Sequence, residues 1–173
     1  MMGTDFITLA NSRFSVRSFS NKNVEQEKID SILLAGLVAP TACNNQPQKI
    51  YVLQTAEALE TLQKCKYSHF GETLAFIVCY DSSLCWTREF DGKVSGDIDA
   101  SIVATHMMLE AWELGIGSTW IMHFIPEAII DEFDLPDSVI PVCILVMGYP
   151  AQDAVPSVQH GRRKDLKELV TVL

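Results

Sequence analysis

The segment from Asp97 to Leu114 constrains the fold more than any other part of the chain, because it carries apolar side chains around most of a helix. Asp97 is placed to cap this helix and Gly115 to end it. A helix that is apolar nearly all round has to be buried. Its histidine, His106, is interpreted as a hydrogen-bonded core residue rather than a ligand. In a chain of 173 residues, packing against a second subunit is one way to cover both sides of such a helix.

Strands and further helices alternate with this segment. Two continuously apolar runs, 74–80 and 140–148, predict strands that are buried on both faces. Asn23 and Gln26 resemble a capping box at the start of a helix over 24–38. Shorter patterns predict further helices and strands, namely helices at 4–11, 56–65 and 126–133, a strand at 49–54, and a turn leading into a strand at 115–124. This order favours an α+β or α/β sandwich with helices on both faces of a sheet.

Composition narrows the class of protein. The length suits one domain over residues 1–173, and a hydrophobic content of 48% leaves apolar surface for a subunit interface or a well-filled core. No apolar run approaches the roughly 20 residues that span a bilayer, and the first residues do not resemble a signal peptide. We therefore expect a cytoplasmic protein without a membrane partner. The net charge of −9 argues against binding to nucleic acid.

Several common sites are missing from the sequence. The five cysteines show neither a CxxC motif nor zinc spacing, so no metal site is expected. Cys43 lies in a polar loop, where we favour a packed thiol over a reactive one because no cation is adjacent in sequence. There is no GxGxxG after a strand, no Walker A motif, no HExxH and no GxSxG. Rossmann, P-loop, metalloprotease and serine hydrolase sites therefore have no support.

What remains is a set of four polar segments. Arg13, Ser15 and Arg17 near the start and the basic group at 162–164 near the end are suited to hold a phosphate. The loop APTACNNQP at 39–47 offers amide donors and acceptors to a planar ring. The glycine turn GIGSTW completes the set. Spacing alone does not place these segments in one site.

The same segments carry a family resemblance. RFSVRSF, followed by a helix and APTACNNQP, resembles the opening of the nitroreductase family. GDIDASIVATHMMLEAWELGIGSTWI resembles the long central helix of that family with its glycine turn and next strand. VMGYPAQ, followed by RRKDLKELV, resembles the closing segment. The matches occur in the family order over nearly the whole chain.

The resemblance implies a bound FMN shared between two subunits. The phosphate and ribityl chain would be held at both ends of one chain, by Arg13, Phe14, Ser15 and Arg17, by Arg163, and less firmly by Arg162. The flavin ring would be contacted from the other subunit by the polar loop, through Pro40, Thr41, Ala42, Asn44 and Gln46. The strand after the central helix would run along the ring, with Gly117, Trp120, Ile121 and Met122.

The implied fold is an α+β, three-layer α/β/α sandwich with a mixed, mainly antiparallel sheet. In this arrangement the central helix forms the core of a homodimer, and the tail after Leu166 completes the partner's sheet. The segment 81–96, where larger relatives carry lid helices, is short. Trp86 and Phe90 would either form a reduced lid or only pack.

The implied function is that of an FMN-dependent oxidoreductase. It would pass hydride from NAD(P)H through FMN to an electron-poor acceptor, nitroaromatic or quinone-like, by a ping-pong mechanism. No side-chain nucleophile is required. The alternative is an FMN-binding carrier or redox-responsive module without nitroreductase turnover. A structural domain without a cofactor would be colourless.

Overall fold

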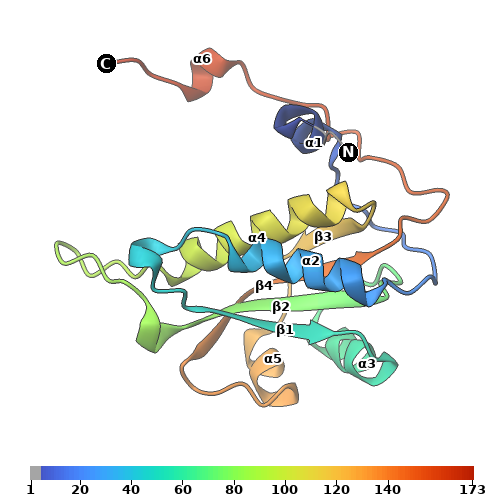
Figure 1. The fold of residues 1–173 in the computed structure, drawn as a ribbon, viewed down its shortest axis with the longest axis horizontal. Coiled ribbons are helices and arrows are strands. Elements are labelled where there is room, and N and C mark those ends of the chain that lie inside the picture. The colour runs from blue at the N-terminus through green and yellow to red at the C-terminus, as the bar shows by residue number, and fades with distance from the viewer. Residues whose placement is uncertain (1–4) are drawn as a thin grey trace.

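A computed structural model describes residues 5–173 and contains a central sheet between two layers of helices (Figure 1). Four strands form the sheet in the order β1-β2-β4-β3. Their bounds are β1 Gln48–Leu53, β2 Leu74–Asp81, β3 Gly117–Ile121 and β4 Val139–Gly148. All three pairs of neighbouring strands are antiparallel. The mixed pairing expected for the sheet is therefore absent from its four strands in the single chain.

The helices cover both faces of this sheet. On one face lie α2 (Gln26–Leu37) and α4 (Gly96–Glu113), and on the other lie α3 (Ala56–Cys65) and α5 (Pro126–Glu132). Four shorter helices complete the described chain, namely α1 Phe6–Ser12, η1 Ala42–Asn44, η2 Ser82–Leu84 and α6 Leu166–Leu169. The predicted α+β, three-layer architecture is confirmed.

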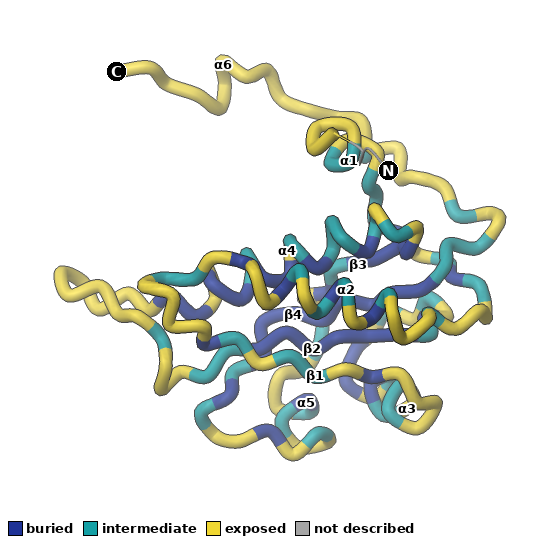
Figure 2. Tube along the Cα trace, in the orientation of Figure 1, coloured by how far each residue is buried: buried dark blue, intermediate teal, exposed yellow. Residues whose placement is uncertain are grey.

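The core consists of two apolar clusters, one on each face of the sheet (Figure 2). Successive side chains of β2 alternate between them, because strand side chains point to opposite faces. Leu74 and Phe76 pack toward α4, whereas Ala75 and Ile77 pack toward α3 and α5. Both inner strands are buried on both sides, as the two apolar runs predict.

Two predicted helix caps are wrong. Asn23 does not cap α2, which begins at Gln26 after Glu25 in an extended conformation. The Glu25 carboxylate is engaged elsewhere, since it accepts a hydrogen bond from the Tyr149 hydroxyl at 2.6 Å and pairs with Lys22 at 2.9 Å. The N-terminal cap of α4 is Ser95, so Asp97 lies inside the first turn.

Helix α4 is buried on the side that faces the sheet and open on the opposite side. Ala100, Val103 and Met107 are fully buried, whereas Ile98 is half-exposed. His106 is half-buried and lines two surface hollows, so its interpretation as a core residue is wrong. The reason is its position on a helix face that α1 and α2 cover only in part. Among residues 5–173, no helix combines the length and apolar character needed to cross a membrane.

The C-terminal segment leaves the sheet and passes α1 (Figures 1 and 2). It ends in the short helix α6, which Asp165 and Glu168 stabilise through a capping box. The apolar side chains of this tail are exposed, namely Leu166, Leu169, Val170, Val172 and Leu173. The tail therefore contributes nothing to the core of its own chain.

Candidate functional site

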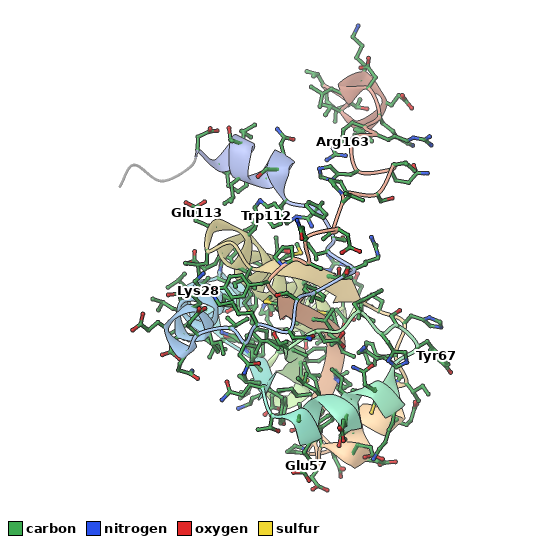
Figure 3. All side chains as sticks on the ribbon, turned by 90° about the vertical axis from the view of Figure 1, so that its right-hand side faces the viewer. Lys28, Glu57, Tyr67, Trp112, Glu113 and Arg163 are labelled. Atoms are coloured by element: carbon green, nitrogen blue, oxygen red, sulfur yellow. The ribbon has the colours of Figure 1, made fainter. Side chains whose placement is uncertain are left out.

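A cavity of about 390 Å³ lies between one segment near the start of the chain and one near its end. It is lined by Arg13, Phe14, Ser15 and Arg17 from the segment after α1, and by Ser157, Gln159, His160 and Arg163 from the C-terminal segment. Figure 3 shows Arg163 above Trp112, the α4 residue against which this region packs. The fold thus brings together the first and last of the four polar segments.

The charge in this cavity is uncompensated. Three of the described residues that line it are arginines and none is acidic. Arg13, Arg17 and Arg163 form no ion pair with a carboxylate in the described part of the chain. Burial and the positive charge of Arg163 lower the pKa of the Arg13 guanidinium. Two guanidiniums held close together in this way favour a bound anion, and a phosphate matches their hydrogen-bonding geometry.

Helix α4 and His160 position the cavity. The ring of Phe14 meets Trp112 edge-on with centroids 5.2 Å apart, and Trp112 donates a hydrogen bond to Ser12 Oγ at 2.9 Å. His160 Nε2 lies 3.1 Å from the Asn11 carbonyl oxygen and so joins the C-terminal segment to the end of α1. Arg163 turns back onto the His160 carbonyl. The end of α4 therefore supports the N-terminal segment, and that segment in turn holds the C-terminal one.

The first residues of β3 lie directly beside this cavity. Ser15 forms a parallel bridge with Ser118, and the Val16 amide donates to the Ser118 carbonyl at 3.0 Å. Gly117 is required at this crossing, because an added Cβ would lie 2.6 Å from Cγ2 of Val16. Gly117, the second glycine of GIGS, thus lets the segment with Arg13 and Arg17 approach the sheet closely.

The side chains of several other predicted residues lie elsewhere, in the core or on the open surface. Ile121 is 5% exposed in the core and Trp120 packs against the other cluster, so these side chains face the interior. Met122 is 63% exposed beyond the end of β3. Arg162 is exposed and does not line the cavity, so of the two neighbouring arginines only Arg163 is in place.

The polar loop lies at the other end of α4. The Ala42 amide donates to Asp99 Oδ1 at 2.9 Å, and Gln46 N donates to Thr41 Oγ1 at 3.0 Å. Pro40, Asn44 and Gln46 are exposed on the surface, and Thr41 and Ala42 are half-buried. The prediction that the Cys43 thiol is packed is wrong for the described chain. The side chain is exposed because its loop lies on the surface.

A second cavity of about 300 Å³ adjoins Ala42. It lies between the loop, the start of α4 and a small hairpin in which Thr87 pairs with Val94. Its apolar lining comes from Trp86, Val94, Ile98 and Ile102. Phe90, at the tip of the hairpin, is 87% exposed and does not line this cavity. The hairpin replaces any long lid helix between β2 and α4.

The arginine cavity and the polar loop do not meet within one chain. Asp99 holds the loop and Trp112 supports the arginine cavity, and these two residues are 13 positions apart on α4. At 1.5 Å per residue the separation is about 20 Å along the helix axis. A ligand much shorter than about 20 Å cannot contact both ends within one chain.

Sequence reasoning missed several residues that line or support these sites. Ser157, Gln159 and His160 lie in a segment without helical or strand periodicity, so no pattern pointed to them. Asp99 had a usable signal, because it is an acidic residue on a helix that is otherwise apolar nearly all round. No group of three or more His, Cys, Asp or Glu side chains in the described residues is arranged to hold a metal ion.

Comparisons with known proteins agree with this geometry. The family model of the nitroreductase family matches residues 10–75 and 76–149. A Methanothermobacter thermautotrophicus protein, provisionally named NADH dehydrogenase/NAD(P)H nitroreductase, is 31% identical over 158 residues, which cover 86% of this chain and 79% of that protein. A solved nitroreductase family protein from Clostridium difficile 630 is 41% identical with a TM-score of 0.91, covering 97% of this chain and 98% of the other.

The name of a second solved structure includes a cofactor. It is an FMN-dependent nitroreductase from Clostridium difficile R20291, 26% identical, with a TM-score of 0.72, covering 92% of this chain and 99% of that one. The resemblance carried by the sequence motifs is thus supported by a family model, by a curated relative and by solved structures. The chain belongs to the nitroreductase family.

Proposed function

We propose that this protein is an FMN-dependent NAD(P)H oxidoreductase that works as a homodimer. The observation that carries the proposal is the arginine cavity, in which Arg13, Arg17 and Arg163 gather without an acidic partner among the described residues. The Ser15 hydroxyl lines the same cavity and adds a hydrogen-bonding group. This combination of charge and donors fits the phosphate of FMN.

The subunit arrangement follows from the distance between the two ends of α4. In the proposed dimer, the loop with Pro40, Thr41, Ala42, Asn44 and Gln46 lies over the arginine cavity of the other subunit. The loop offers amide groups to a planar ring, and the β3 backbone from Gly117 to Met122 lies beside the same position. The ring is then enclosed by two subunits, which limits the access of water.

Held by Arg13, Ser15, Arg17 and Arg163, FMN would supply the redox chemistry, which is the transfer of hydride from NAD(P)H to an acceptor. The chain itself holds the cofactor, orients its ring and shapes the space for the two substrates, which use that space in turn. The cavity lined by Trp86, Val94, Ile98 and Ile102 adjoins the loop and offers an apolar surface to a small planar acceptor of the nitroaromatic or quinone class.

The absorption spectrum of the purified protein tests the cofactor. We expect a yellow protein that releases FMN, and anaerobic addition of NADH or NADPH should bleach the flavin band. Adding a nitroaromatic or a quinone should then restore the band. A colourless protein that does not take up FMN would contradict the proposal. Reduction without reoxidation by any acceptor would instead indicate an FMN carrier.

Arginine variants test the phosphate assignment. Arg13→Ala and Arg163→Ala each remove a charge-assisted hydrogen bond worth about 1.5–3 kcal/mol, so the Kd for FMN should rise about tenfold or more. Arg162→Ala is the matched control, because Arg162 is the adjacent arginine and does not line the cavity. Equal FMN binding by all three variants and the parent would overturn the assignment.

A further inference from the structure

Asp99 is a buried carboxylate on the first turns of α4. Asp99 is 2% exposed, and no lysine or arginine of the described chain forms an ion pair with it. Oδ1 accepts the Ala42 amide at 2.9 Å and Oδ2 accepts the Ser95 hydroxyl at 2.7 Å. Because burying a carboxylate is costly unless its oxygens are hydrogen-bonded, these two bonds are the reason that Asp99 is tolerated in the interior.

The backbone of the loop that Asp99 holds is strained. Cys43, Asn44 and Gln46 have φ values of +51°, +54° and +51°, in the left-handed region that residues other than glycine rarely adopt. Each such residue costs about 1–2 kcal/mol, and such a conformation persists only where surrounding contacts enforce it. Hydrogen bonds within the loop, from Asn45 N to the Ala42 carbonyl and from Gln46 N to Thr41 Oγ1, support its shape. Contacts from outside the loop attach it to the rest of the fold.

Two hydrogen bonds connect this loop to other elements. Asn45 Nδ2 donates to the Leu84 carbonyl at 3.1 Å, but Asn45 is exposed. The Ala42–Asp99 bond is the better protected of the two, since its acceptor is buried and is carried by the longest helix of the described chain. Asp99 therefore attaches the strained loop to the rigid part of the fold.

We infer that Asp99 is a positioning residue, which holds the loop at 40–46 in the conformation that meets the flavin ring. This inference rests on the proposed function, because the ring contact belongs to it. Asp99 is among the residues that line the cavity beside Ala42. Its hydrogen bond with the loop is the one that it accepts from the Ala42 amide. In the proposed dimer the loop reaches the partner subunit's cavity, so Asp99 in one subunit orients the ring whose phosphate is held by the other.

Three substitutions separate this role from general effects. Asp99→Ala removes both acceptors, whereas Asp99→Asn retains an oxygen for the Ala42 amide. Asp97→Ala is the matched control, because it removes an exposed acid from the same first turn. It therefore reproduces the loss of favourable charge at the helix N-terminus but leaves the loop attached.

The first measurement uses the FMN-free full-length chain. Amide hydrogen exchange reports directly on the Ala42–Asp99 bond. We expect Asp99→Ala to speed exchange at Ala42 at least tenfold, with Asp97→Ala equal to the parent and Asp99→Asn within threefold of it. Unchanged exchange at Ala42 in Asp99→Ala would overturn the inference, because the bond would then not control the loop.

The second measurement is made with FMN. We expect the Kd for FMN to rise at least tenfold in Asp99→Ala, with a changed visible circular dichroism of the flavin, and to be restored within threefold in Asp99→Asn. If the parent binds FMN and Asp99→Ala binds it equally well, the positioning role is wrong while the proposed function stands. A parent protein that takes up no FMN would overturn the proposed function itself.

Discussion

The side chains of Lys66 and Glu72 form a fully buried ion pair, 2.7 Å apart, beneath the segment that joins α3 to β2. Gln63 and the Phe70 amide complete the hydrogen bonds of the Glu72 carboxylate. Removing one member of such a pair leaves an uncompensated buried charge, at a cost of about 3–5 kcal/mol. Lys66→Met should therefore lower the free energy of unfolding in urea by that amount. A loss below about 1 kcal/mol would show that the site relaxes or admits water.

The same pair gives a prediction for acid. Burial alone would raise the pKa of Glu72, but hydrogen bonds from Lys66, the backbone and Gln63 hold it below its ordinary value of 4.5. A lowered pKa in the folded state contributes stability above pH 4.5 that is lost as the pH falls below it. Glu72→Gln should thus flatten the fall in unfolding free energy below pH 4.5, measured by urea unfolding over a series of pH values. A variant with the parent's slope would contradict this expectation.

At the scale of elements, the crossing between the arginine segment and β3 depends on Gly117. A Cβ at this position would lie within 3 Å of two side-chain atoms of Val16, both close to the backbone. Gly117→Ala should therefore force the segments apart, lower the free energy of unfolding by about 1–3 kcal/mol and raise the Kd for FMN. Gly161→Ala is the control, because nothing lies within 4 Å of the point that its added methyl group would occupy. Equal FMN binding in both variants would contradict the assigned close approach.

The sequence predicts elements better than the contacts between them. Helix α3 has the predicted bounds, and β2 is one residue longer than predicted. The continuous apolar run of β2, which Asp81 follows, marks that strand clearly. The caps at Asn23 and Asp97 are wrong because each helix begins two residues or fewer from the predicted start, at Gln26 and Gly96, which lies within the usual uncertainty of helix ends. Pattern also cannot show that Asp99 and Ala42 meet, since 57 positions separate them.

For the predicted cofactor residues too, the sequence identifies the residues better than it shows which of them meet. Arg13, Ser15, Arg17 and Arg163 line one cavity because the N-terminal segment packs on Trp112 and the C-terminal segment packs on it in turn, through His160. Spacing could not have placed them together, and the family resemblance was needed. The segment at 150–164 has no periodicity, so the contribution of His160 is visible only once the chain is folded.

For the whole molecule, the two ends of α4 indicate where the twofold axis of the proposed dimer would lie. An axis that brings the loop held by Asp99 to the partner's cavity beside Trp112 crosses α4 midway, near Thr105 and His106. In a twofold interface these residues meet their own copies. His106→Glu should place two carboxylates next to each other and raise the dimer Kd at least tenfold in sedimentation velocity, with loss of FMN. The surface control Gln54→Glu should leave the dimer intact, and an intact His106→Glu dimer would exclude this axis.

The C-terminal tail gives the last test of the dimer. Its five apolar side chains lie outside the core of their own chain, and the proposed assembly buries them against the partner subunit. Burying a leucine stabilises an interface by about 1.5–3 kcal/mol, so losing Leu166 and Leu169 alone corresponds to roughly a hundredfold or more in dimer Kd. Deleting 166–173 should therefore dissociate the dimer in sedimentation velocity and release FMN, whereas Lys167→Gln should do neither. If the shortened chain stays dimeric, the open face of α4 is sufficient for assembly and the tail serves another surface.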